Sequence, residues 1–479
     1  MTLAPPPRPK PLDPGLIDRF KALLGAKGWT QAAADLAPHL KEWRDLYRGE
    51  TPLMLKPAST AEVAAILKLC HETATPVVPQ GGNTGMCGGA IPFGQVLLWL
   101  GRMNRIRALD PLNDTLVAEA GVVLAQVQEA ADRADRLFPL SFGGEGSAMI
   151  GGNLSTNAGG SGVLRYGNAR DLVLGIEAVL PDGTVWDGLR ALRKDNTGYD
   201  LKHLFIGAEG TLGVITAAVL KLYPKPRDVQ TAFAAVRDPA AAVELLARLQ
   251  GLSGGAVTGF EIVPRLGIDM LLRHIPGTRD PLPAPHAWYL LIELSSGRAS
   301  GALRETLETG LAEAQSAGLI ADASLAQNQA QADGFWRLRD ALSEAQNKEG
   351  ARAAHDVSVP RSAIPEFIDR AVAACARAAP GVRCLPFGHI GDGNIHFNVS
   401  QPAGGDRAAF LARFEAINHA VYDVAHALGG SISAEHGLGR MKVEEILRYK
   451  DPVEMAVMRR IKALFDPKGI MNPGKVLEV

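Results

Sequence analysis

The sequence lacks the features that mark nucleic-acid binders, secreted domains and membrane proteins. Its 50 Lys and Arg are balanced by 51 Asp and Glu, which leaves no basic field for nucleic acid or an anionic lipid surface. Its four cysteines include no CxxC pair, which argues against a zinc ribbon or a disulfide framework and predicts a reducing, cytoplasmic location. No apolar run approaches the roughly 20 residues of a spanning helix, and the proline-rich start lacks the apolar core of a signal peptide.

Glycine is the informative excess, at 52 of 479 residues where about 7% is usual. Many of these glycines lie in two blocks, "QGGNTGMCGG" (80–89) and "FGGEGSAMIGGNLSTNAGGSG" (142–162). Backbone N–H groups approach a diphosphate closely only where no Cβ intervenes, so both blocks suit a long dinucleotide. The first block is neither a Walker loop nor GxGxxG, and taken alone it is also compatible with an ordinary turn.

Hydrophobic periodicity predicts a mixed α and β chain of more than one domain. Ser59 and Glu62 form a capping box that should begin a helix. Glycine becomes less frequent after about Pro226, and single predicted strands then alternate with longer predicted helices. This alternation is typical of a sheet covered by helices on one face. Unbroken helices are expected over 329–347 and 407–428. We therefore expect an N-terminal segment that is partly disordered or helical (1–45), a first domain (46–226) and a second domain with a looped tail (227–479).

The stretch "GHIGDGNIHFNVS" (388–400) gathers polar side chains around a glycine turn. Alternation along "NIHFNVS" places His396 and Asn398 on one face of a strand, and His389 would approach them across a hairpin. Asp392 is expected to be a structural turn residue. Two histidines do not define a site, so simple hydrogen bonding of each ring to backbone remains an alternative.

The stretch "SAEHGLGR" (433–440) places Glu435 beside His436, directly before two glycines. Together with His389 and His396, Glu435 would complete an N2O ligand set with an open fourth position, which is typical of a catalytic divalent-metal site. His436 would then remain available as a base. A metal-dependent hydrolase with some other nucleotide in its glycine blocks is compatible with this set.

The stretch "FWRLRDALSEAQ" (335–346) places Arg339 and Ser343 four residues apart, so that they would share one face of a helix. The planar guanidinium of Arg339 suits a carboxylate. Taken alone, an exposed arginine on a solvated helix face explains this spacing equally well.

The order of these motifs, which also include "EGTLGVIT" and "DPKGIMNPGK", resembles a known family. It is similar to the vanillyl-alcohol oxidase/p-cresol methylhydroxylase class of FAD enzymes, in the branch that holds D-2-hydroxyglutarate dehydrogenase, D-lactate dehydrogenase and one component of glycolate oxidase. The likeness runs from about residue 45 to the C-terminus. It implies an α+β fold, with a two-subdomain FAD-binding domain (46–226) and a C-terminal α+β cap domain with a mainly antiparallel sheet (227–479).

The resemblance also implies roles for individual residues. His389, His396 and Glu435 match ligands of a divalent ion, zinc first, with manganese and iron also compatible. His436 matches the catalytic base, and three residues match substrate contacts: Arg339, Ser343 and Asn398. FAD would be bound non-covalently, since the flavin-facing blocks contain no histidine, by the following residues: Pro79, Gly81, Gly82, Asn83, Thr84, Gly85, Ser147, Gly152, Asn157, Gly159, Gly213 and Ile215.

The activity implied by the resemblance is oxidation of a D-2-hydroxy acid to the 2-oxo acid by hydride transfer to flavin, with D-2-hydroxyglutarate as first choice. Ala354 stands where the hydroxyglutarate enzymes have a substrate lysine, although Arg352 can reach in instead. A D-lactate or glycolate dehydrogenase, or a flavin-carrying subunit of a larger oxidase complex, is therefore an alternative. The sequence leaves open the electron acceptor (quinone, electron-transfer flavoprotein or cytochrome) and the oligomeric state, a homodimer included.

Overall fold

The structure is a computed structural model that describes residues 11–478. The chain forms two compact units, each with its own core. The first unit comprises the chain up to Gly159, residues 168–224 and residues 435–479; the second comprises Gly160–Gly167 and Lys225–Ala434. The expectation of a partly disordered start falls in part on residues 1–10, which lie outside the described residues. The domain boundaries at residues 46 and 227 stay predictions.

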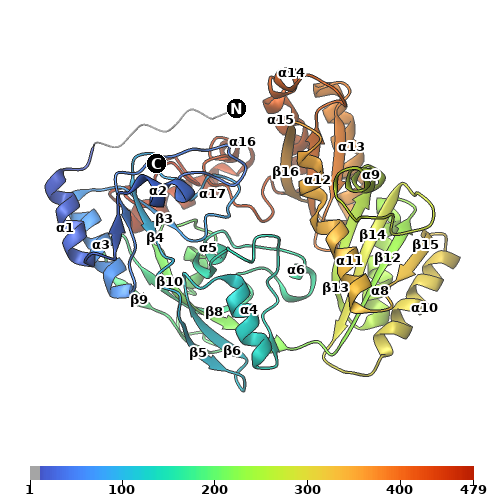
Figure 1. Cartoon of the computed structure of the whole chain (residues 1–479), viewed down its shortest axis with the longest axis horizontal. Coiled ribbons are helices and arrows are strands. Elements are labelled where there is room, and N and C mark those ends of the chain that lie inside the picture. The colour runs from blue at the N-terminus through green and yellow to red at the C-terminus, as the bar shows by residue number, and fades with distance from the viewer. Residues whose placement is uncertain (1–10, 479) are drawn as a thin grey trace. The chain divides into compact units, whose positions relative to one another are not determined.

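Two larger sheets organise the first unit (Figure 1). The mixed sheet has four strands, in the order β1 (Trp29–Thr30), β2 (Met54–Leu55), β4 (Val96–Trp99) and β3 (Val77–Gln80). The antiparallel sheet has five strands, in the order β5 (Ile106–Asp110), β6 (Thr115–Glu119), β10 (Val214–Lys221), β8 (Val173–Val179) and β9 (Val185–Asp187). A short antiparallel pair is added by β7 (Arg136–Leu137) and β11 (Tyr223–Pro224).

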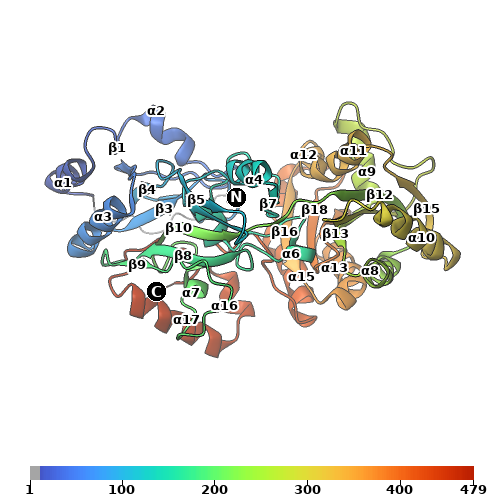
Figure 2. The same cartoon turned by 90° about the horizontal axis from the view of Figure 1, so that it is seen from below.

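Helices of very different lengths cover these sheets. The longer ones are α1 (Pro14–Leu24), α3 (Thr60–Thr73), α4 (Leu124–Arg133) and α17 (Pro452–Phe465). The shorter ones are α2 (Ala33–Leu36), the 3-10 turn η1 (Ala37–His39), α5 (Ile150–Ser155), α7 (Lys202–Phe205) and α16 (Glu445–Tyr449). Figure 2 shows α7 beside α17, where the rings of Phe205 and Phe465 meet edge to face at 5.6 Å.

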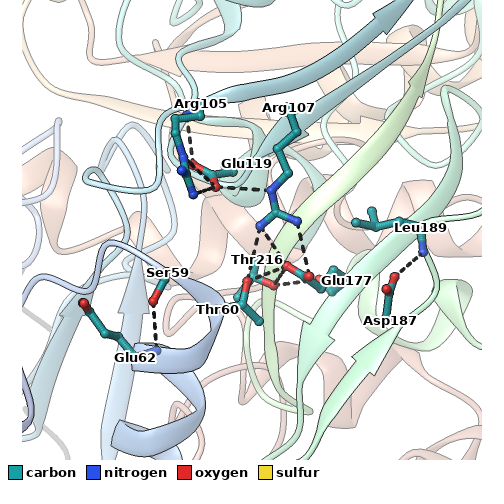
Figure 3. Close-up of polar contacts among 10 residues, drawn as sticks. All are labelled: Ser59, Thr60, Glu62, Arg105, Arg107, Glu119, Glu177, Asp187, Leu189 and Thr216. Atoms are coloured by element: carbon teal, nitrogen blue, oxygen red, sulfur yellow. Dashed lines mark hydrogen bonds and ion pairs between the residues drawn. The ribbon is translucent and has the colours of Figure 1, made fainter.

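The capping box predicted at Ser59 is confirmed. Ser59 Oγ accepts a hydrogen bond from the backbone N–H of Glu62 at 3.2 Å (Figure 3). In addition, Glu62 Oε2 accepts from Ala58 N at 2.8 Å. Because the first N–H groups of a helix have no partner within it, such a cap fixes where α3 begins. The carboxylate reaches Ala58 rather than Ser59 itself, a small variation on the usual reciprocal pattern.

A buried ion network ties α3 to the five-stranded sheet (Figure 3). Glu177 Oε1 accepts from Thr60 Oγ1 at 2.6 Å and from Thr216 Oγ1 at 2.7 Å. Arg107 bridges Glu177 and Glu119, at 3.1 and 3.2 Å. Burial alone would raise the pKa of Glu177, but the hydrogen bonds from Arg107, Thr60 and Thr216 lower it, so the carboxylate stays ionised at neutral pH.

The C-terminal tail is part of the first unit's core. Residue Met471 pairs with Val77 in a parallel bridge along the edge of β3, and Ile470 and Met471 are fully buried in the cluster that contains Leu67 and Val96. The tail that the sequence presented as a loop therefore extends the mixed sheet. Its place beside β3 also brings Asn472 close to the first glycine block, because Asn472 Nδ2 donates to Gly89 O at 3.0 Å.

The second unit contains two antiparallel sheets, and this confirms the expected mainly antiparallel α+β arrangement (Figure 2). The larger has four strands, in the order β13 (Val257–Pro264), β14 (Trp288–Ser296), β12 (Asp228–Val236) and β15 (Ile320–Leu325). The smaller has three, in the order β16 (Arg352–Ser358), β18 (Asn394–Ser400) and β17 (Arg383–Phe387). The two sheets meet where Ile262 of β13 forms an antiparallel bridge with Gly388.

The helices of the second unit correct two expectations. The helix expected over 329–347 is divided into α11 (Gln329–Asp340) and α12 (Leu342–Asn347), and the helix expected over 407–428 is divided into α14 (Arg407–Leu411) and α15 (Phe414–Ala427). The other helices of this unit are α6 (Val163–Tyr166), α8 (Pro239–Ser253), α9 (Arg265–His274), α10 (Ala302–Ser316), η2 (Arg361–Ala363) and α13 (Ile364–Ala378). The first break occurs where Leu342, almost fully buried, packs against Gly267 of α9. Tertiary packing thus redirects a chain whose local propensity is helical throughout.

Candidate functional site

The two glycine blocks of the first unit lie against one another. The first follows β3, and a Cβ on Gly82 would sit only 2.0 Å from the backbone oxygen of Ser147 in the second block. A Cβ on Gly81 would meet Met149 at 3.3 Å. Asn83 adopts a left-handed φ of 54° and its Nδ2 donates to Lys41 O at 2.9 Å, which fixes the turn between the glycines. Glycine is therefore required here for close approach of backbone to backbone.

Other glycines of the blocks face open space. A Cβ on Gly85, Gly146 or Gly152 would meet no atom within 4 Å. Beside Gly152, the Nδ2 atom of Asn153 is buried and has no hydrogen-bond partner among the described residues. A buried amide without a partner costs free energy, and a bound group with acceptor oxygens would remove that cost. These features fit a phosphate-bearing dinucleotide such as FAD.

Several of the remaining predicted FAD residues have structural partners in this region. Asn157 has a left-handed φ of 52°, and its Oδ1 accepts from Arg170 N at 2.9 Å. Gly213, with φ 158°, brings its backbone close to Val179 O, and Ile215 is almost fully buried on β10. The residues not yet placed are in the same blocks or at the end of β3: Pro79, Thr84 and Gly159. Their roles toward FAD stay predictions.

In the second unit, a polar row runs along one face of β18, as the sequence predicted. Asn398 Nδ2 donates to Gln346 Oε1 at 2.8 Å, and Gln346 Nε2 donates to Ser400 Oγ at 2.8 Å. The neighbouring strand adds to this row, because the antiparallel register pairs Ala354 with Asn398 and Arg352 with Ser400. Arg352 NH1 donates to the same Gln346 Oε1 at 3.0 Å.

The two histidines also come together. The rings of His389 and His396 are 5.3 Å apart, which confirms that the "GDG" turn forms a hairpin. Asp356, paired with His396 in the register, has its Oδ1 3.9 Å from His396 Nδ1. Asp392 has the turn role expected, since its Oδ1 accepts from Asn394 N at 3.0 Å.

Glu261 connects His389 to the predicted substrate arginine. Its Oε1 lies 2.6 Å from His389 Nδ1, and its Oε2 accepts from Arg339 Nε at 2.7 Å. Arg339 NH2 in turn lies 3.4 Å from His389 Nε2. Burial alone would raise the pKa of Glu261, but His389 and Arg339, which both bond its carboxylate, lower it to about 2. Arg339 is therefore no solvated surface residue. Ser343, half-buried on α12, lies beyond the helix break, and its expected role beside Arg339 stays a prediction.

Glu435 and His436 lie in an irregular segment rather than a strand. His436 Nε2 is 3.8 Å from Glu435 Oε1. The following turn is held by Glu209, which accepts from Leu438 N at 2.7 Å and from Gly439 N at 2.9 Å. Burial raises the pKa of Glu209 to about 6, although these two backbone N–H groups oppose the shift. The segment that carries Glu435 and His436 is thus anchored within the first unit.

Four side chains form a candidate group of metal ligands. Asp356 and His396 are neighbours in the second unit, and Glu435 and His436 are neighbours in the first. Mixed imidazole and carboxylate ligands suit zinc, manganese or iron. His389, expected as a ligand, is not in this group, and Asp356 was not expected in it.

Sequence reasoning missed four residues of this region: Glu209, Glu261, Gln346 and Asp356. Glu209 lies inside "EGTLGVIT", which the sequence had marked for its family resemblance, and Asp356 lies two residues after Ala354, which had been considered for the substrate. Glu261, in the apolar strand "GFEIV", carried a usable signal, because a charged residue in a buried strand needs a partner. Gln346 ends the marked segment "FWRLRDALSEAQ", but its position beside Asn398 follows only from the packing of α12 on β18.

Comparison with known families adds a further finding. Residues 51–188 match the FAD binding domain, and residues 225–476 match the C-terminal domain of FAD linked oxidases. The second match alone covers more than half of the chain. The chain belongs to the family of FAD-linked oxidases. As a member of this family it is an FAD-dependent oxidoreductase, and FAD is the cofactor that its glycine blocks fit.

Individual relatives of this FAD-linked oxidase agree. The chain is 41% identical over 467 residues to the D-2-hydroxyglutarate dehydrogenase, mitochondrial, of Arabidopsis thaliana, covering 97% of this chain and 82% of that protein. The Bos taurus protein of the same name is 38% identical over 92% of this chain and 80% of its own length. Among solved structures, p-cresol methylhydroxylase with substrate bound matches with a TM-score of 0.77 at 19% identity, covering 98% of each chain. At this low identity the likeness supports the fold alone, and it confirms the predicted fold of the p-cresol methylhydroxylase type.

The predicted cytoplasmic location is wrong in light of these relatives, which are named as mitochondrial. Scattered thiols indicate a reducing environment, and this property does not distinguish the cytosol from the interior of an organelle. Within the described residues, none of the helices combines the length and the apolar character needed to cross a membrane.

Proposed function

We propose that this FAD-linked oxidase oxidises a D-2-hydroxy acid to the 2-oxo acid with the help of a divalent metal ion, and that D-2-hydroxyglutarate is its preferred substrate. The observation that carries the proposal is the buried row of Arg339, Glu261, His389 and His396, which puts a carboxylate-binding guanidinium beside imidazoles suited to a metal. The 41% identity to a plant enzyme named for this substrate supports the same choice.

Each polar residue has a task in this proposal. Arg339 binds the carboxylate of the substrate next to the 2-hydroxyl group, and its bond to Glu261 holds the guanidinium in place. His396 and Glu435, with His389 or Asp356, would hold the metal, whose charge would lower the pKa of the substrate hydroxyl. His436 accepts the hydroxyl proton on a ring nitrogen, since an imidazole with an ordinary pKa near 6.5 is neutral at physiological pH. Non-covalently bound FAD would accept the two electrons.

A second, distal carboxylate would lie further along the polar row. Residues i and i+2 of a strand are roughly 6.5 Å apart, so a five-carbon dicarboxylate held at Arg339 and His396 can extend toward Asn398 and Ala354. Gln346 Oε1 accepts from both Asn398 and Arg352, which places the Arg352 guanidinium next to this position. We propose that Arg352 takes the distal carboxylate, because the small Ala354 leaves room for it. A D-lactate dehydrogenase is the second candidate, favoured by that same alanine if Arg352 stays bonded to Gln346.

A substrate panel tests the proposal. Purified protein should be yellow, and D-2-hydroxyglutarate should bleach the flavin absorbance under anaerobic conditions faster than D-lactate, glycolate or any L-enantiomer. Dialysis against a strong chelator should abolish this bleaching, and Zn²⁺ or Mn²⁺ should restore it. Full activity in a verified metal-free sample would contradict the metal, and a yellow protein inert to every 2-hydroxy acid would contradict the dehydrogenase.

A further inference from the structure

We infer that Glu261 is a positioning residue, which prepares His389 for a metal and at the same time fixes Arg339 for the substrate. The inference rests on the proposed function, because it takes His389 as a ligand and Arg339 as the carboxylate clamp. Its own basis is the geometry of one buried carboxylate with two different partners. Glu261 is 1% exposed and lies within 2.7 Å of both Arg339 and His389.

The backbone sets the distance between Glu261 and His389. Two backbone hydrogen bonds join β13 to the end of β17: Ile262 N donates to Gly388 O at 2.9 Å, and Gly388 N donates to Ile262 O at 3.0 Å. Glu261 precedes Ile262 and His389 follows Gly388, so the two side chains leave the same bridge from neighbouring positions. Because successive side chains of a strand alternate in direction, Glu261 points opposite to the buried Phe260 and Ile262. The pair is therefore fixed by the junction of the two sheets.

The contacts define which nitrogen of His389 carries a proton. Arg339 can only donate, so its contact of 3.4 Å makes His389 Nε2 the acceptor. Nδ1 must then carry the proton and donate it to Glu261 Oε1 at 2.6 Å. With the Nδ1–H of His389 directed at Glu261, Nε2 is the nitrogen that would bind a metal ion, in place of its contact with Arg339. Metal-binding histidines characteristically donate their other N–H to a carboxylate in this way.

The same carboxylate aims Arg339. The Nε–H of Arg339 donates to Glu261 Oε2, and this bond turns the terminal nitrogen NH2 toward His389 Nε2. A substrate carboxylate bound by the terminal nitrogens would thus lie beside the nitrogen that binds the metal. Glu261 thereby couples the position of His389, the proposed metal ligand, to the position of Arg339, which would bind the substrate carboxylate.

A second buried glutamate in the same sheet offers a matched control. Glu293 of β14 lies opposite Gly259 in the register with β13, and it accepts from Trp336 Nε1 at 2.7 Å and Thr258 Oγ1 at 3.1 Å. Its partners are neutral, and burial raises its pKa. Glu293 lies in the same sheet as Glu261, but its hydrogen bonds go to Trp336 and Thr258 rather than to His389 and Arg339.

The test compares Glu261→Gln with Glu293→Gln. Glutamine has an NH2 group in place of one of the two oxygens that bond His389 and Arg339, so one of these two hydrogen bonds is lost in the native geometry. The Zn²⁺ affinity of Glu261→Gln, measured by competition with a fluorescent chelator, should therefore fall about 10- to 100-fold. The KM for the hydroxy acid should rise as well, while FAD content stays normal. Glu293→Gln should bind Zn²⁺ as the native protein does. In a His389→Ala background, Glu261→Gln should cause no further loss of affinity, since Glu261 acts through that ring.

The outcomes separate this inference from the proposed function. If His389→Ala binds Zn²⁺ like the native protein, the proposed ligand role fails. If His389→Ala loses affinity and Glu261→Gln does not, only the role of Glu261 is overturned. Should Glu261→Gln fail to fold, nitrogen-15 spectra of histidine-labelled, metal-free native protein decide the matter: a proton on Nδ1 of His389 supports the inference, and a proton on Nε2 overturns it.

Discussion

The glycine blocks of the first unit and the candidate site of the second unit differ in the chemical groups that they present. The glycine blocks of the first unit present backbone and small side chains, and their close contacts, such as Gly82 on Ser147 O, are between main chains. The candidate site of the second unit consists of ionisable side chains away from bulk water, and Glu261, Arg339 and His389 contact one another directly. We therefore expect the first region to recognise its ligand by shape and N–H dipoles, and the second by charge.

The contrast follows from what each region would hold. A dinucleotide is long, and a strip of glycines lets backbone N–H groups reach it without the desolvation of a charged side chain. A small hydroxy acid offers few atoms, so charge-assisted hydrogen bonds must supply most of the recognition. The first region should therefore respond to added volume and the second to lost charge.

The largest effect is expected from His436→Ala. Loss of the base should lower the rate of flavin reduction about 10²- to 10⁴-fold, because the hydroxyl proton has no acceptor, while FAD remains bound. Anaerobic stopped-flow absorbance measures the rate, and the flavin spectrum after gel filtration measures the cofactor. Near-normal turnover would remove His436 from the role of base.

Gly82→Ala and Gly85→Ala should separate chain packing from cofactor contact. The new methyl group on Gly82 would overlap Ser147 O, and overpacking of this kind costs about 1–3 kcal/mol, so the FAD-free protein should already be less stable. The methyl group on Gly85 meets no atom within 4 Å in the described part of the chain, so Gly85→Ala should leave the FAD-free protein intact and weaken FAD binding instead.

Thermal unfolding with and without added FAD measures both glycine variants. Gly251→Ala, where the new methyl group on helix α8 also meets nothing, is the matched control and should bind FAD normally. If Gly85→Ala binds FAD as tightly as the control does, the first glycine block does not line the cofactor.

Arg352→Met should lower kcat/KM for D-2-hydroxyglutarate about 10- to 100-fold, the usual worth of a hydrogen bond to a charged group. Turnover of D-lactate should hardly change, because it has no distal carboxylate. Steady-state kinetics on both substrates measures the split. An equal loss on both would point to a general effect through Gln346, and no loss on either would assign the distal carboxylate elsewhere.

A separate effect, on stability rather than on catalysis, concerns Lys475, which is buried and donates to Ile91 O at 3.1 Å just after the first glycine block. Burial, followed by the charge of Arg440, lowers its pKa from 10.5 to about 7. Between these values the unfolded chain binds the extra proton, so the free energy of unfolding should rise as pH increases from 7 to 10. Lys475→Met should remove this rise. Denaturant titrations of both proteins across that range would contradict the assignment if their difference stayed flat.

Local elements of the fold could be predicted well from the sequence. The capping box placed the start of α3 correctly, and alternation in "NIHFNVS" placed His396 and Asn398 on the right face of β18. Both signals depend on residues close in the chain. The helix break before Leu342 could not be predicted, because it depends on Gly267, some seventy-five residues earlier in the sequence.

The site was predicted unevenly for the same reason. The type and spacing of the histidines and glycines were enough to predict a metal site and a dinucleotide site. Glu261 lies in an otherwise apolar strand, and it gains its partners only where β13 pairs with Gly388. The sequence by itself determined the glycine strips, the polar strand face and the family. Only the tertiary structure decided that Arg339 and His389 share one buried carboxylate, because a charge out of water needs partners that only the folded chain brings within hydrogen-bond distance.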